Sequence, residues 1–204
     1  MASKIIVDQL EKSGFTTLTL PSANATANQY IKNDGAGALS WATLPSSGKI
    51  LHIEQVVKTD TTSTTAVAGA LVDIAGMTVT MPASVATSRY LVSWDLSIGA
   101  TATWWVHLTL VRRVSGVDVT PVVGDTAGSR DTVTTDANPA HSNAAPASSF
   151  TYLDSPATTS AVTYKIKWAL MQAGTTYLNR SHGDADTVAQ ARDTSTLTVM
   201  EIGV

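Results

Sequence analysis

The sequence contains no cysteine, which excludes disulfide bonds and thiolate metal sites. It is also poor in charge, because charged residues make up 14% of the chain against about a quarter in a typical globular protein. No basic run is present, so we expect no nucleic-acid partner. No stretch approaches the ~18 consecutive apolar residues of a membrane-spanning helix, so we expect no membrane insertion.

The low charged content is balanced by a high content of small and β-branched residues. The chain has 31 Thr and 28 Ala among its 204 residues, and its hydrophobic content of 44% is ordinary. Thr fits the pleated, half-buried surface of a sheet, and its stiff side chain disfavours helix. The composition therefore predicts an all-β protein.

The pattern of the chain changes at about residue 47. Residues 1–47 hold short apolar islands separated by turn signals such as Asn33-Asp34-Gly35. Islands this small cannot offset the ordering cost of ~1–2 kcal/mol per residue within one chain. The segment is therefore either disordered or ordered by a neighbour, and the repeated islands favour the neighbour. We predict a stem over residues 1–47 and a globular head over residues 48–204.

The head alternates apolar and polar side chains with the period of strands that have one face in a core. The strand candidates are 50–58, 69–74, 76–81, 89–98, 103–113, 117–123, 148–153, 161–171 and 195–202. About nine strands of this kind predict a β-sandwich or jelly roll. The stretch 124–147 is long for a connection inside a compact domain, which indicates a functional or interface loop.

The tryptophans divide by their place in the alternation. Trp94, Trp104 and Trp168 share the parity of the inward-facing residues, so we expect them in the core. Trp105 has the opposite parity and faces either a neighbouring subunit or a ligand, of which we favour the subunit. Trp41 belongs to the stem and is expected to pack at the junction with the head.

Motifs that carry chemistry are weak in this sequence. There is no nucleophile elbow and no phosphate-binding loop. His107 is flanked by apolar residues, which favours a structural role. The loop 181–186 combines His182 with two aspartates and could hold a cation, although a solvated turn is the better interpretation. We therefore expect no catalytic residues, no metal and no cofactor.

The stretch SKIIVDQLEKSGFTTLTLPSANATANQYIKNDGAGALSWATLP, residues 3–45, resembles the N-terminal part of tail-fibre-like and virion surface proteins of bacteriophages. The resemblance is to those that infect cyanobacteria and marine bacteria. The element from Asp34 to Trp41 resembles a segment that lies just before a globular head in these proteins. The ending STLTVMEIGV also resembles the last strand of their heads.

The resemblance implies a homotrimer whose head is a jelly roll of the tumour-necrosis-factor type. Three parallel stems would then bury apolar side chains that one stem cannot bury alone. The residues assigned to this trimer packing are Phe15, Leu18, Leu20, Ile31, Leu39 and Trp41 in the stem, with Trp105 in the head.

Two structural functions follow from the resemblance. In the first, the protein is a short tail fibre or spike, whose stem docks on the tail or baseplate and whose head contacts a host surface glycan or protein. In the alternative, it is a decoration or cement protein of the capsid. A glycan-degrading enzyme is a distant third. In both structural cases the protein is made in the host cytoplasm and resides on the virion, with other virion proteins as partners.

Overall fold

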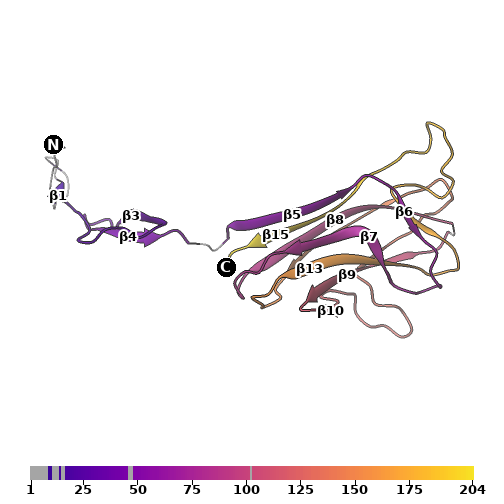
Figure 1. The fold of residues 1–204 in the computed structure, drawn as a ribbon, viewed down its shortest axis with the longest axis horizontal. Coiled ribbons are helices and arrows are strands. Elements are labelled where there is room, and N and C mark those ends of the chain that lie inside the picture. Colours follow the sequence, from indigo (N-terminus) through magenta and orange to yellow (C-terminus); the bar gives the residue numbers. More distant parts are fainter. Residues whose placement is uncertain (1–8, 11–13, 15–16, 46–47, 102) are drawn as a thin grey trace. The chain divides into compact units, whose positions relative to one another are not determined.

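The computed structural model describes residues 9–10, 14, 17–45, 48–101 and 103–204. The chain forms two compact units, Met1–Ser46 and Ser47–Val204. Every regular element in the described residues is a β-strand (Figure 1). These residues contain no helix with the length and hydropathy that crossing a membrane requires.

The described part of the first unit is built around a hairpin. Its strands are β1 (Gln9–Leu10), β2 (Leu18–Thr19), β3 (Gln29–Asn33) and β4 (Leu39–Thr43). β3 pairs antiparallel with β4 and places Ile31 opposite Trp41. The turn is closed by Asp34, whose carboxylate accepts backbone N–H bonds from Ala36 at 2.8 Å and Ala38 at 3.0 Å. The turn signal of the sequence therefore becomes a capped hairpin.

The head contains the long strands. They are β5 (Ile50–Lys58), β6 (Thr62–Thr64), β7 (Val72–Met81), β8 (Arg89–Ala100), β9 (Val106–Val114), β10 (Val117–Val119), β11 (Thr135–Ala137), β12 (Ala147–Asp154), β13 (Val162–Leu170), β14 (Thr176–Leu178) and β15 (Ser195–Ile202).

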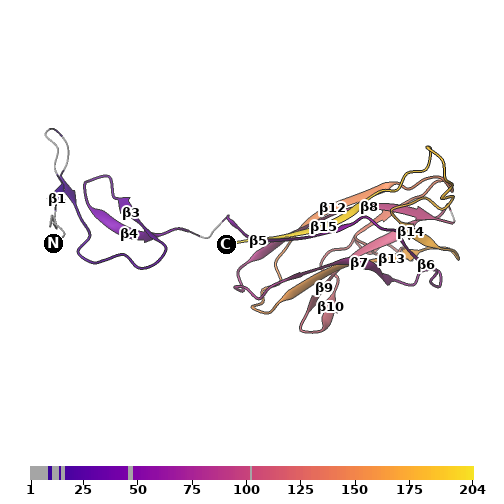
Figure 2. The ribbon, with the colours of Figure 1, turned by 45° about the horizontal axis from the view of Figure 1, so that its top comes forward.

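Eight of these strands form two facing sheets with the order β5-β15-β8-β12 and β7-β13-β9-β11. Consecutive strands of the eight alternate between the sheets except for β9 and β11, which pair within one sheet, and the last strand β15 lies between β5 and β8. This is the arrangement of an eight-stranded jelly roll. Figure 2 shows β12, β8 and β15 in one layer and β7, β13 and β9 in the other. β14 and β6 extend the first sheet beyond the end of β15, and β10 forms a hairpin with β9. The predicted all-β jelly-roll head is confirmed.

The two ends of the head are bonded to each other. The backbone N–H of Gly48 donates to the carbonyl of Gly203 at 2.6 Å, and the N–H of Gly203 donates to the carbonyl of Lys49 at 2.9 Å. The head therefore begins and ends at the same edge of the sandwich.

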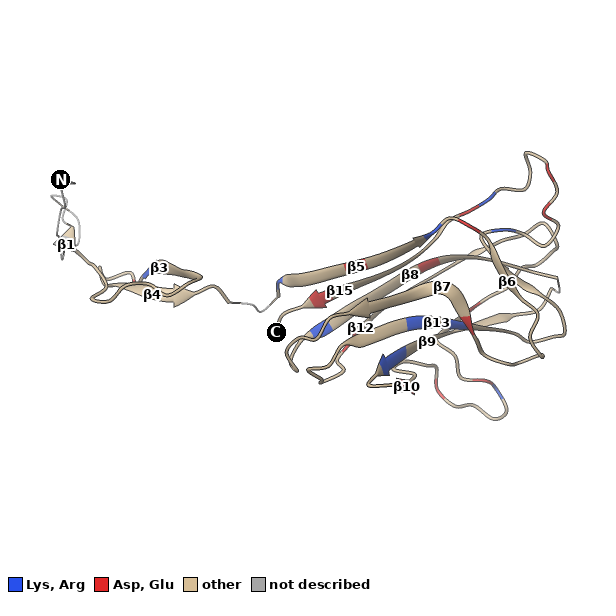
Figure 3. Ribbon diagram, in the orientation of Figure 1, with Lys and Arg blue, Asp and Glu red and all other residues tan. Residues whose placement is uncertain are grey.

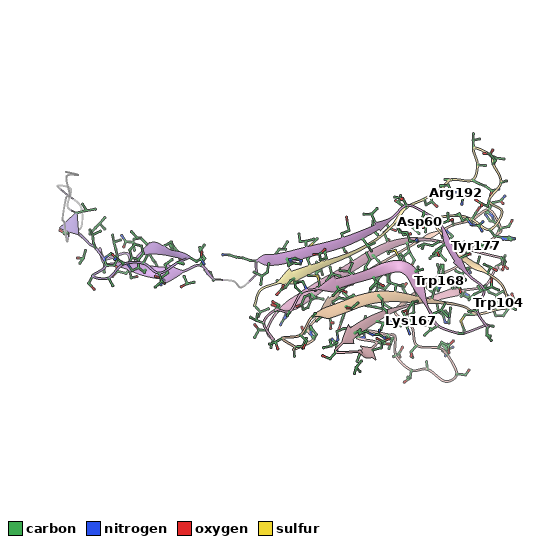
Figure 4. The ribbon with its side chains drawn as sticks, in the orientation of Figure 1. Asp60, Trp104, Lys167, Trp168, Tyr177 and Arg192 are labelled. Carbon is green, nitrogen blue, oxygen red and sulfur yellow. The ribbon has the colours of Figure 1, made fainter. Side chains whose placement is uncertain are left out.

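One core fills the space between the sheets. Trp94 on β8 and Trp168 on β13 are buried in it, as the alternation predicts. The prediction for Trp104 is wrong, because 50% of this residue is exposed. β9 begins at Val106 and not at residue 103, so the alternation does not extend back to Trp104. Figure 4 labels Trp168 within the sandwich and Trp104 at the end of the head opposite the start of β5.

A buried ion pair connects the two sheets. Asp154, the last residue of β12, is 2% exposed. Both oxygens of its carboxylate accept hydrogen bonds from Nη1 of Arg112 on β9, at 2.8 and 2.9 Å. The hydroxyl of Tyr164 on β13 donates to the same carboxylate at 2.7 Å. Burial, together with the nearby Asp154 charge, raises the pKa of Tyr164 far above its ordinary value, so the phenol stays protonated and donates.

Asn179, which directly follows β14, anchors the loop 179–194. It is fully buried, and its φ of 63° lies in the left-handed region that Asn adopts more readily than most residues. Its side-chain N–H groups donate to the carbonyls of Lys58 and Asp60 at 2.8 and 2.9 Å. The anchored loop approaches β8 where Gly99 has no side chain, and the carbonyl of Arg180 occupies the space that a Cβ would need.

Candidate functional site

The outer face of the β7–β13–β9 sheet carries charges that pair with one another. Lys165 lies 3.0 Å from Asp73 and 3.0 Å from Asp118 of β10, and Lys167 lies 3.7 Å from Asp73. Arg113 also binds Asp118, and this hydrogen bond is the main reason that the pKa of the Asp118 carboxyl is below its ordinary value. Charges arranged in this way favour contact with water over contact with an apolar partner.

The outer face of the opposite sheet has a different composition, and we call it the charge-poor face. It is formed by the outward residues of β5, β15, β8 and β12, which are Ile50, Ile53, Gln55, Val57, Thr196, Thr198, Met200, Ile202, Arg89, Leu91, Ser93, Asp95, Ser97, Ala147, Ser149, Thr151 and Leu153. Only Arg89 and Asp95 among them are charged. Figure 3 shows Lys and Arg on β13 and β9 of the opposite sheet.

An apolar row crosses all four strands of the charge-poor face. Met200 pairs with Ile53 on one side and with Leu91 on the other, and Leu91 pairs with Leu153. Partners in an antiparallel ladder point to the same face, so the four side chains lie next to one another over roughly 14 Å, given ~4.8 Å between strands. Ile53 is 51% and Leu153 41% exposed. Leu91 and Met200 between them are half-buried. An apolar row that reaches the surface across a whole sheet is typical of a protein interaction surface.

A second feature lies beside the connection between β8 and β9, and we call it the Trp105 depression. It has a volume of about 510 Å³ and is lined by Trp105, His107, Arg130, Asp131, Val133 and Asp136. A neighbouring hollow of about 210 Å³ shares His107, Asp131 and Val133 with it and adds Leu71. The polar groups therefore converge beside an indole ring, which is 48% exposed.

Strand pairing positions the walls of the Trp105 depression. β11 pairs with β9 and places Asp136 opposite His107. The carbonyl of Trp105 accepts a hydrogen bond from the N–H of Met171 at 3.1 Å, which fixes the residue that precedes β9. Nδ1 of His107 lies 3.6 Å from Oδ2 of Asp131, beyond hydrogen-bond range. Sequence reasoning missed Arg130, Asp131 and Asp136, although the unusual length of the stretch 124–147 indicated that it was functional or at an interface.

The structure places the stem residues assigned to trimer packing as follows. Phe15 lies outside the described residues. Leu18, Leu20, Leu39 and Trp41 are half-buried, and Ile31 is exposed. Within the described part of the first unit, only Gly37 is buried. The indole N–H of Trp41 donates to the carbonyl of Ala23 at 2.6 Å, so its polar edge is satisfied within the stem unit. The role of these residues in a trimer stays a prediction.

The loop 181–186 is held by arginines. The carboxylate of Asp184 lies 3.2 Å from Arg180 and 2.8 Å from Arg192. Arg180 also lies over the ring of Tyr177, 3.8 Å from its centre, and the ring of His182 stacks on the same tyrosine. Both partners of Asp184 are cations, so this carboxylate is already neutralised within the protein. The residues that the structure describes contain no group of three or more His, Asp or Glu placed to bind a metal.

Comparison with known proteins adds little. No protein-family model and no curated protein matches the chain. Among solved structures, the chain is similar to one from the structure of infectious bursal disease virus Gx strain, with 11% identity and a TM-score of 0.36. The match covers 95% of this chain and 46% of that chain, so this chain spans less than half of its length. A similarity this low supports no conclusion about function.

Proposed function

We propose that the chain is a homotrimeric structural protein of a phage particle, a short tail fibre or spike whose stem docks on the particle and whose head contacts the host surface. The observation that carries the proposal is the difference between the two outer faces of the head. The outer face of the β7–β13–β9 sheet carries a network of ion pairs. The charge-poor face has few charged residues and is crossed by the apolar row. Interface cores are depleted of charged residues in the same way.

Burial of the apolar row against a second copy would stabilise an oligomer. A fully buried Ile, Leu or Met side chain contributes roughly 1.5–3 kcal/mol. Ile53 and Leu153 are about half exposed, so each would add about 1 kcal/mol per protomer on complete burial. The same argument applies to the stem, because Ile31 and Leu44 are exposed in a unit that buries few of its own side chains. The proposed trimeric state and the proposed location on a phage particle rest on the resemblance of residues 3–45 to phage virion proteins.

The fold is compatible with this role. Jelly rolls serve as capsid and lectin domains, where the sandwich provides a rigid body and its surfaces bind neighbours or ligands. A fold alone does not assign a function, so the proposal depends on the charge-poor face. Light scattering of the purified protein is expected to give three times the chain mass of 21.3 kDa. A monomer at micromolar concentration would overturn the proposal.

Ile53→Asp is expected to weaken or abolish the trimer, because it places a charge in the apolar row on edge strand β5. Thr78→Asp is the matched control, since Thr78 is exposed on β7, the edge strand of the ion-paired face. Both changes are at the surface and leave the core intact. Sedimentation velocity over a concentration series measures the association of each variant. Equal weakening by the two variants would exclude the charge-poor face as the interface.

The position on the particle has a separate test. Mass spectrometry of purified virions gives the number of copies per particle. A tail fibre or spike is expected in few copies, up to a few dozen, whereas hundreds of copies would assign the protein to capsid decoration. Absence of the protein from purified virions would reject both.

A further inference from the structure

We propose that the Trp105 depression is a saccharide-binding site. The proposal deepens the proposed function by naming the class of ligand that the head would contact, and it rests on that function for its biological role. The site itself is formed within one head, from Trp105 just before β9, from β9 and β11, and from the loop between β10 and β11.

The indole of Trp105 provides the apolar part of the site. It stands half-exposed beside a hollow, although an aromatic ring of this size gains most from burial. One face of a pyranose ring presents C–H groups and packs well on an aromatic plane. The hydrogen bond from Met171 to the carbonyl of Trp105 and the start of β9 at Val106 fix the backbone on the C-terminal side of Trp105. A side chain that projects from a fixed backbone loses less conformational entropy on binding than one on a mobile loop.

The polar walls match the hydroxyl groups of a sugar. Each hydroxyl can donate one hydrogen bond and accept others. The carboxylates of Asp131 and Asp136 accept, the guanidinium of Arg130 donates, and the imidazole of His107 can do either. Pockets with one apolar wall and a few convergent polar groups are the usual form of small-molecule sites.

Charge and size narrow the class of ligand. Two carboxylates against one guanidinium disfavour a phosphate or another strong anion. The volume of about 510 Å³ lies within the ~300–1,000 Å³ of small-molecule sites and suits a short saccharide. The neighbouring hollow of about 210 Å³ continues past His107 and Asp131. It leaves room for the chain of a saccharide to extend from the depression.

The test uses the full chain and two neighbouring tryptophans. Trp104 and Trp105 are adjacent and equally exposed, at 50% and 48%, but only Trp105 lines the depression. Wild type, Trp104→Ala, Trp105→Ala and Asp131→Asn are applied to an array of bacterial lipopolysaccharides and capsular polysaccharides. Saturation-transfer NMR with methyl hexosides measures binding in solution. We expect binding by wild type and Trp104→Ala, and at least tenfold weaker binding by the other two variants.

Three results would overturn the site. They are no saccharide bound by the wild type, equal losses for Trp104→Ala and Trp105→Ala, and dissociation of the oligomer by Trp105→Ala. The last would instead make Trp105 a subunit contact. Light scattering of every variant measures its oligomeric state and so distinguishes a saccharide site at Trp105 from a subunit contact. A monomeric wild type that binds sugar through Trp105 would reject the proposed trimer and support the site.

Discussion

Replacing Arg112 with alanine is expected to lower the free energy of unfolding by about 3–5 kcal/mol, the usual result of removing one partner of a buried ion pair. The Asp154 carboxylate would remain 2% exposed with no cation beside it. The hydrogen bond from Tyr164 would persist but supplies no charge. The loss is large because the Asp154 side chain is 3% exposed, so its charge would stay buried without the partner that compensates it.

Arg113→Ala is the matched control for this prediction. Arg113 is the next residue of β9, and it pairs with Asp118 nearer the surface, where the two side chains are 47% and 30% exposed. Surface pairs contribute about 0–1 kcal/mol. Denaturant unfolding at one protomer concentration compares the variants, since stability depends on concentration in an oligomer. Similar losses for the two arginines would show that the buried pair has no special role.

Gly99→Ala is expected to cost about 3 kcal/mol or more, at the upper end of the range for overpacking. The new methyl group would overlap the carbonyl oxygen of Arg180 and lie 3.0 Å from Cα of Ser181. Backbone atoms cannot rotate away as a side chain does. The loop is also tied down by Asn179, so relief of the clash would require breaking buried hydrogen bonds to Lys58 or Asp60.

Gly124→Ala provides the comparison. Its new methyl group would meet only the carbonyl oxygen of Val133 at 4.0 Å, and its φ is open to alanine. We expect a change within about 0.5 kcal/mol. Thermal unfolding of the two variants would measure the difference. If Gly99→Ala has the same melting temperature as the wild type, β8 and the loop 179–194 are not packed as closely as described.

The long strands could be predicted from the sequence because alternation is a local signal. The candidates 50–58 and 195–202 coincide with β5 and β15, and 89–98 lies within β8. The strands β6, β11 and β14 were not predicted. Each has three residues, too few to show a period, and each is held by pairing with a neighbour distant in sequence.

The candidate sites were harder to predict because they depend on register. Leu91, Leu153 and Met200 are far apart in the sequence and become neighbours only when β12 and β15 pair with β8. The error at Trp104 has a related cause. Alternation gives the parity of a residue within a strand, but it does not tell where the strand begins.

The bonded ends of the head make it a natural candidate for circular permutation. Gly48 and Gly203 are already hydrogen-bonded, so a short linker from Val204 back to Gly48 would close the sandwich without disturbing a strand. New ends could be opened at Thr159 and Ser160, which are exposed between β12 and β13. Such a rearranged head would keep both sheets while dispensing with the stem, and its assembly state would tell how much of the association belongs to the sandwich by itself.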